Sequence, residues 1–175
     1  MKIAGIIKND VVNGIGVCTS LFVQGCPHHC LGCFNQDSWD FNGGYETNDV
    51  KGTIVKAIGA NGITRNFSIL GGEPLCPENR KMVKDVLSAV KIAYPSIKIF
   101  LWTGYTLEEL QQENDTDLEY ILSNINFLID GRFKQEEKDY SLWLRGSKNQ
   151  NIYMLTEDKK YVIINQEDEK EILNK

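Results

Sequence analysis

Three cysteines lie within the stretch CPHHCLGC at positions 26–33 of this 175-residue sequence. Their spacing, C-x3-C-x2-C, can wrap the thiolates of Cys26, Cys30 and Cys33 around one metal centre, because soft thiolates bind iron–sulfur clusters and zinc alike. A cubane cluster or a tetrahedral zinc takes four ligands, so the loop leaves one position for another group. The spacing alone leaves both kinds of centre open.

A zinc site would need a fourth protein donor, and the candidates are His28, His29, Cys18 and Cys76. The two histidines lie inside the loop, where it is difficult to reach an ion that the flanking cysteines already hold. Cys18 falls within an expected strand and can be a small buried residue. The sequence has five cysteines in all, an odd number that favours metal binding or catalysis over a disulfide framework.

Length and composition describe an ordinary globular protein. Apolar residues make up 42% and charged residues 25% of the sequence, and the formal net charge of −5 argues against a nucleic-acid partner. The N-terminus has no apolar stretch long enough for a signal peptide, and no segment is suited to span a bilayer. We therefore expect one cytoplasmic domain over residues 1–175, without a membrane partner.

Buried strands and amphipathic helices are expected to alternate along the chain. The expected strands are 18–24, 66–70, 97–102 and 125–130. The expected helices are 48–58 with Asn48 as N-cap, one that begins at Pro77, and one or two helical turns within 106–124. Beyond about residue 132 the pattern is irregular, with a last strand expected at 161–165 and a surface helix or frayed end at 166–175.

This alternation predicts βαβ crossovers, a mainly parallel sheet and an α/β fold. An eight-fold barrel needs roughly 250 residues, so we expect an open, incomplete β/α barrel.

Each unusual motif directly follows an expected strand. After the cysteine loop come GGEP (71–74), TGY (103–105) and DGRF (130–133). Because the carboxyl ends of parallel strands build the sites of α/β proteins, we expect these motifs to surround one site. GGEP alone reads as a strand-to-helix turn, but its position one βα unit after the cysteine loop favours a site.

Together these segments resemble the anaerobic ribonucleoside-triphosphate reductase activating proteins of the radical S-adenosylmethionine (SAM) superfamily. The matching segments are VNGIG (12–16), FVQGCPHHCLGCFNQDSW (22–39), GGEPL (71–75), WTGYTLEEL (102–110), LIDGRF (128–133) and LRGSKNQ (144–150). The resemblance implies a single radical SAM domain with a core of about 12–150 and a C-terminal tail of about 156–175. Ile15 and Asn151 depart from the family, which has proline and a basic residue there.

The resemblance also implies a cofactor and a reaction. Cys26, Cys30 and Cys33 would ligate three irons of one 4Fe–4S cluster, and the amino and carboxylate groups of SAM would fill the vacancy on the fourth. Reductive cleavage would give methionine and a 5′-deoxyadenosyl radical, which generates a glycyl radical on an anaerobic ribonucleotide reductase. Reduced flavodoxin is the implied electron donor. The alternatives are another small radical SAM enzyme, with a different glycyl-radical enzyme or a small molecule as substrate, and a zinc-binding module without catalysis.

Further residues are implied as SAM contacts, with no catalytic side chain beyond the cluster and SAM. Gly71 and Gly72 would let the backbone approach the methionine moiety, and Glu73 would accept hydrogen bonds from its ammonium group. The adenine side would be lined by Gly32, Cys33 and Phe34, with Gly32 in contact through its backbone, and Asn35 would hydrogen-bond SAM or the surroundings of the cluster.

Two strand ends complete the implied site. Thr103 and Tyr105 would lie near the ribose, and Asp130 would face the same mouth and bind SAM or the substrate peptide. As alternatives, Tyr105 is an amphipathic rim residue and Asp130 a turn residue. His28 and His29 are expected to shield or tune the cluster from outside its ligand shell.

Overall fold

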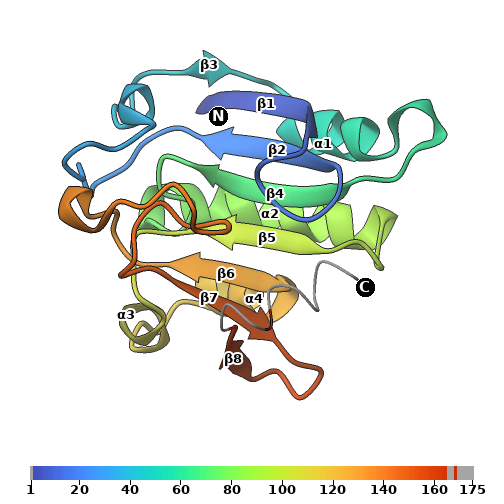
Figure 1. Ribbon diagram of the computed structural model, residues 1–175. Helices are drawn as coiled ribbons and strands as arrows, with labels where there is room; N and C mark the ends of the chain where they lie inside the picture. The colour runs from blue at the N-terminus through green and yellow to red at the C-terminus, as the bar shows by residue number, and fades with distance from the viewer. Residues whose placement is uncertain (1, 165–167, 169–175) are drawn as a thin grey trace.

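The computed structural model describes residues 2–164 and 168, which form an eight-stranded sheet with helices on one side (Figure 1). The strands are β1 (Lys2–Asp10), β2 (Cys18–Val23), β3 (Tyr45–Glu46), β4 (Asn66–Gly71), β5 (Ile99–Trp102), β6 (Phe127–Asp130), β7 (Asn151–Leu155) and β8 (Tyr161–Ile163). The α-helices are α1 (Val50–Ile58), α2 (Pro77–Ala93), α3 (Leu107–Gln111) and α4 (Thr116–Asn124). Short 3-10 turns occur at Gln36–Ser38, Ala60–Gly62 and Gln135–Glu137.

The strand order is β3-β1-β2-β4-β5-β6-β7-β8, and only the centre is parallel. Strands β2, β4, β5 and β6 pair in parallel, as the alternating pattern predicts. The pairs of β1 with β2 and β3, and of β7 with β6 and β8, are antiparallel. The expectation of a mainly parallel sheet is therefore corrected to a mixed sheet, because the pattern did not reveal β1, β3 and β7.

The other expected elements are found with small changes. Helix α1 is capped by Asp49, whose side chain accepts a hydrogen bond from Gly52 N at 2.8 Å, and not by Asn48. Helix α2 begins at Pro77 as predicted. The last expected strand is found over Tyr161–Ile163, and the predicted helix or frayed end at 166–175 lies outside the described residues apart from Asp168.

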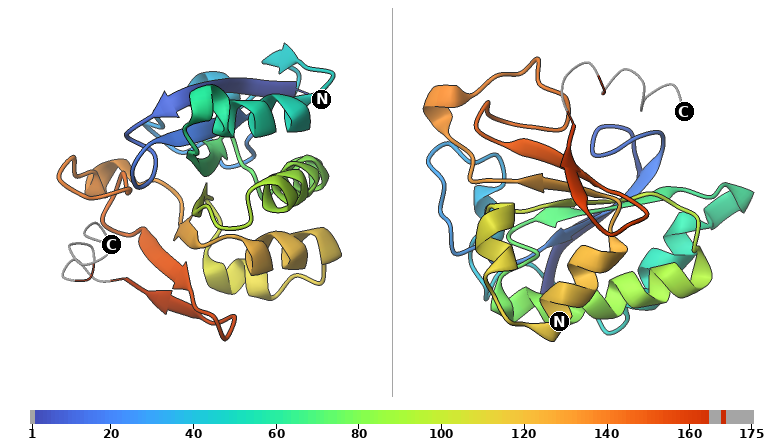
Figure 2. Two further views of the ribbon diagram at one scale, coloured as in Figure 1. Left: turned by 90° about the vertical axis from the view of Figure 1, so that its right-hand side faces the viewer. Right: turned by 90° about the horizontal axis from the view of Figure 1, so that it is seen from below.

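The two faces of the sheet have different surroundings (Figure 2). Helices α1, α2 and α4 cover one face, and the irregular segment 131–150 crosses part of the other. Successive side chains of a strand point to opposite faces. Ile99 and Leu101 of β5 belong to the main core, whereas Phe100 and Trp102 belong to a smaller cluster on the other face. We call the second face the open face.

None of the helices within residues 2–164 is both long enough and apolar enough to cross a membrane.

Candidate functional site

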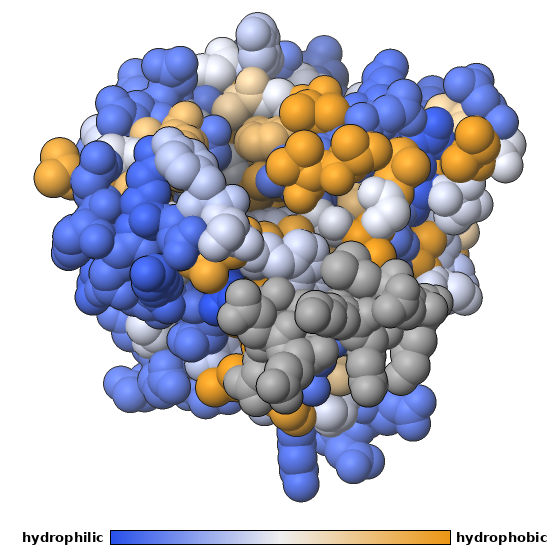
Figure 3. Space-filling model, viewed as in Figure 1, coloured by the Kyte–Doolittle hydropathy of each residue, from blue (hydrophilic) through white to orange (hydrophobic). Residues whose placement is uncertain are grey.

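A cavity of about 530 Å3 opens where the carboxyl ends of the parallel strands meet segment 131–150. Its volume is within the range of small-molecule sites. Figure 3 shows hydrophobic side chains gathered beside a hollow on this face. The predicted site residues that line the cavity are Cys26, Cys30, Cys33, Phe34, Asn35, Gly71, Gly72, Glu73 and Thr103.

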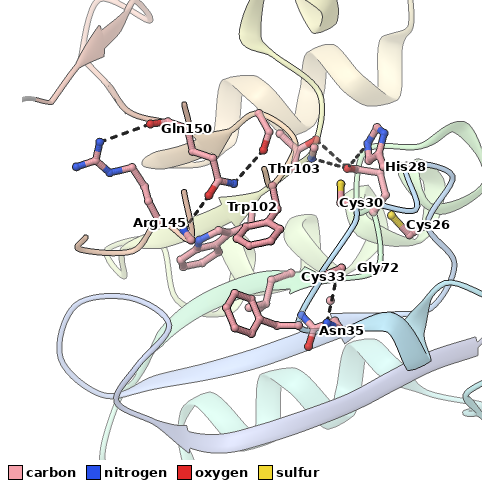
Figure 4. A pocket seen from close by; sticks show the side chains of 18 of the residues that line it. Cys26, His28, Cys30, Cys33, Asn35, Gly72, Trp102, Thr103, Arg145 and Gln150 are labelled. Carbon is pink, nitrogen blue, oxygen red and sulfur yellow. Dashed lines mark hydrogen bonds and ion pairs between the residues drawn. The ribbon is translucent and has the colours of Figure 1, made fainter. Parts of the chain in front are cut away.

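The cysteine loop begins directly after β2 and is closed at its base by main-chain bonds. Cys26 N donates to Trp39 O at 3.0 Å, and Gly25 N donates to Ser38 O at 2.8 Å. The buried side chain of Gln24 donates to the carbonyl oxygens of Asp37 and Asp40. The loop is therefore a closed unit that carries three free thiols at one side of the cavity (Figure 4).

Burial raises the pKa of the Cys26 thiol to about 11, and it also raises the pKa of Cys30. Main-chain hydrogen bonds partly offset this rise: the one from His28 N–H lowers the pKa of Cys26, and the one from Phe133 N–H lowers the pKa of Cys30. The thiols are thus protonated until a metal displaces the protons. The same N–H groups would then stabilise the thiolates.

The donor set fits a cluster better than a single ion. Among the described residues, no three His, Cys, Asp or Glu side chains are arranged to hold one metal ion. A cubane distributes three thiolates over three irons, so it needs them further apart. Trp39 lines the cavity, and its buried indole Nε1 has no hydrogen-bond partner within the described part of the chain. A cluster would offer sulfur acceptors to such a donor.

The two glycines of GGEP allow the end of β4 to pack against the start of the cysteine loop. Gly71 has a φ of +108°, and a Cβ there would lie 2.8 Å from Phe22 Cα. A Cβ on Gly72 would collide with the main-chain carbonyl of Gly25. This close packing of backbone on backbone gives a reason for both glycines that does not involve the methionine moiety of SAM.

Glu73 is 1% exposed and connects three parts of the site. Its Oε1 accepts hydrogen bonds from Leu75 N and Thr103 Oγ1, both at 2.8 Å. Its Oε2 accepts from Gly104 N at 2.6 Å and lies 2.9 Å from His28 Nε2. Figure 4 shows the bonds that converge from His28 and Thr103. The carboxylate thereby joins the cysteine loop to the ends of β4 and β5.

Two of the predicted site residues, Tyr105 and Gly32, lie beside the cavity and do not line it. Tyr105 packs edge-on against His28, with ring centroids 4.6 Å apart, and burial raises its pKa to about 12. Gly32 has a φ of +73°, and the side chain of Gln135 occupies the space that a Cβ would take.

Asp130 is fully buried on the helix side of β6, in line with Leu128 of the main core. It accepts hydrogen bonds from Leu107 N at 2.8 Å, Asn151 N at 3.2 Å and Asn151 Nδ2 at 3.1 Å. Burial raises its pKa. Asp130 therefore fixes the start of α3 and the register of β7, and the expectation that it faces the mouth is corrected.

Segment 131–150 supplies cavity residues that the sequence reasoning missed. Phe133, Leu144 and Arg145 line the cavity from this segment. Gln150 holds the segment in place, because its Oε1 accepts from Gly146 N at 2.8 Å while its Nε2 donates to Gly131 O at 2.9 Å. The LRGSKNQ motif was the available signal, but without a regular element around it no direction could be assigned to its side chains.

Comparison with known proteins agrees with this site. A family model described as a 4Fe-4S single cluster domain matches residues 12–153. The chain is 41% identical over 149 residues to the anaerobic ribonucleoside-triphosphate reductase-activating protein of Vibrio cholerae, which covers 84% of this chain and 94% of the relative.

Two further relatives carry the same name. The protein of Escherichia coli K12 is 38% identical over 148 residues, covering 83% of this chain and 94% of its own length. The protein of Enterobacteria phage T4 is 36% identical over 150 residues, covering 85% and 90% respectively. The resemblance seen in the motifs is confirmed: the chain belongs to the family of anaerobic ribonucleoside-triphosphate reductase-activating proteins and contains a 4Fe–4S cluster domain.

Proposed function

We propose that this protein is a radical SAM enzyme that activates an anaerobic ribonucleoside-triphosphate reductase by generating a glycyl radical on it. The observation that carries the proposal is the meeting of the three-cysteine loop with the GGEP strand end at one cavity, in a chain of the activating family. Cys26, Cys30 and Cys33 would hold three irons of the cluster and leave the fourth open for SAM.

When bound, the reduced cluster would give one electron to SAM, break its S–C5′ bond and release methionine and a 5′-deoxyadenosyl radical that takes the Cα hydrogen of a glycine. One electron per event must then come from a low-potential donor such as reduced flavodoxin. The cavity wall formed by Phe22, Leu70 and Trp102 would keep water away from the reactive carbon. Phe34, Asn35 and Thr103 line the cavity: Phe34 would contact the adenine, Asn35 would hydrogen-bond SAM, and Thr103 would lie near the ribose.

The rim of the cavity supports a protein substrate over a small molecule. Val12, Phe34 and Tyr140 line the cavity and are nevertheless 75%, 62% and 83% exposed. Exposed apolar residues grouped at one mouth are typical of protein–protein contact. Helices on one face only also support an incomplete barrel, in which a loop of the reductase would complete the wall of the site.

Anaerobic reconstitution with iron and sulfide tests the proposal. We expect a brown protein that, once reduced and mixed with SAM and the reductase, forms 5′-deoxyadenosine. A colourless protein that binds one zinc would contradict it. An intact cluster that cleaves SAM without acting on the reductase would favour a radical SAM enzyme with another substrate.

A further inference from the structure

The carboxylate of Glu73 is saturated by donors of the protein itself. An ionised carboxylate offers about four acceptor positions, and Glu73 receives bonds from Leu75, Thr103, Gly104 and His28. The ammonium group of SAM could bind this carboxylate only by displacing one of them. The geometry is therefore that of a residue that holds parts of the protein together.

Of these four donors, only His28 comes from the cysteine loop. It lies between Cys26 and Cys30, and its side chain is 5% exposed. Its ring packs against Tyr105 and against the main chain of Gly104, where a Cβ would collide with the imidazole. The ring is thus enclosed on the strand-end side and hydrogen-bonded at Nε2.

We propose that His28 is a positioning residue that fixes the cysteine loop against the ends of β4 and β5 through its hydrogen bond to Glu73. The bond would set where the thiols of Cys26, Cys30 and Cys33 lie relative to the strand ends that would receive SAM. Glu73 then supports SAM binding indirectly, by holding His28 and Thr103. This inference rests on the proposed function and assigns a specific part of that site.

The proposal and a direct role of Glu73 predict opposite effects of removing His28. If Glu73 binds the SAM ammonium directly, His28 competes for the carboxylate, and His28→Ala should tighten SAM binding. If His28 positions the loop, His28→Ala and Glu73→Ala should both weaken SAM binding. Because both changes break the same hydrogen bond, the double variant should bind SAM no more weakly than the single variant with the lower SAM affinity.

The experiment uses the full-length protein, reconstituted anaerobically and reduced, with SAM titrated against the EPR signal of the cluster. We expect about a tenfold to hundredfold weaker SAM affinity for His28→Ala, Glu73→Ala and the double variant. His28→Gln should recover most of the affinity, because the glutamine amide can place a donor near the position of Nε2. Leu31→Ala is the matched control: Leu31 belongs to the same loop but is 80% exposed and does not line the cavity, so this variant should keep its affinity within about twofold.

Iron content after reconstitution and thermal unfolding of the apoprotein accompany each titration. If His28→Ala folds but loads no iron, recovery of iron and affinity in His28→Gln supports the positioning role, and a glutamine variant as defective as alanine contradicts it. SAM binding in His28→Ala equal to or tighter than wild type, or additive losses in the double variant, would also overturn it. Wild-type protein from the same preparation that forms 5′-deoxyadenosine once the reductase is added shows that only this inference, and not the proposed function, has failed.

Discussion

The helix-covered face and the open face of the sheet are held together by different interactions. On the helix-covered face, apolar side chains such as Leu21, Ile69 and Leu101 are fully buried in one continuous core. On the open face, buried polar groups bind main-chain atoms of loops, as Glu73 does at the cavity and Asp10 does beneath the β1–β2 connection. Apolar packing determines that the sheet folds, whereas the directional bonds of the open face determine where the loops of the site lie.

The largest expected effect separates the loop cysteines from the buried ones. Single replacement of Cys26, Cys30 or Cys33 by Ala should abolish stable cluster binding and SAM cleavage, because each removes one thiolate ligand. Cys18→Ala and Cys76→Ala should keep both, since these thiols bond to main-chain carbonyls inside the protein. Iron and sulfide analysis and 5′-deoxyadenosine formation measure the difference.

Loss of the cluster in a folded Cys76→Ala variant would make Cys76 a fourth ligand. No vacancy would then remain for SAM, and the division between the two groups of cysteines would be wrong.

Neighbouring residues of β5 test the comparison directly, because Leu101 and Trp102 point to opposite faces. Leu101→Ala should lower the free energy of unfolding by about 2–5 kcal/mol through the cavity that it leaves in the core. Trp102→Phe should cost about 1 kcal/mol, because it loses the hydrogen bond from Nε1 to Leu144 O at 2.8 Å. Urea unfolding of the apoproteins measures both.

SAM affinity should change in the reverse order, falling in Trp102→Phe and staying near wild type in the folded fraction of Leu101→Ala. Equal destabilisation by the two changes would remove the distinction between the faces.

The smallest expected effect is a pH dependence on the open face. Burial would raise the pKa of Asp10, but hydrogen bonds from Asn13, Ser20 and Val12 outweigh it and hold the pKa below its usual value. A lowered pKa in the folded state gives stability that is present above the unfolded pKa near 3.8 and is lost as the pH falls through the folded value. Asp10→Asn should therefore cost less than about 1 kcal/mol at pH 7 and progressively less toward pH 3.

Urea unfolding across that pH range checks the effect of Asp10. If the difference in free energy of unfolding between wild type and Asp10→Asn stays constant from pH 7 to pH 3, the charge of Asp10 contributes nothing to stability.

The two faces also differ in how far the sequence could predict them. Buried runs such as CTSLFV and IFLW predicted the parallel strands, because these strands are largely apolar and are covered on both faces. Strand β1 was missed because only Ile3 and Asp10 of its nine residues are buried, and β3 because it has only two residues. These strands are fixed by pairing with distant neighbours, which local periodicity does not report.

For the site, the sequence motifs predicted which residues meet but not how they interact. Cys26, Glu73 and Thr103 do line one cavity, as the carboxyl-end rule predicts. The bond between His28 and Glu73 could not be predicted, because it depends on the path of the loop after β2. Asp130 was assigned to the wrong face because a motif at a strand end does not say toward which side of the sheet its side chain points.

We infer that the open cavity acts on a glycine of the reductase. The most direct measurement is EPR spectroscopy of a mixture of the reconstituted protein, SAM, a reductant and the anaerobic ribonucleotide reductase. We expect a glycyl radical doublet on the reductase, with little 5′-deoxyadenosine formed when the reductase is omitted. With an intact cluster and a reductase that its own activating protein can activate, the absence of the doublet would show that the cavity does not act on this glycine.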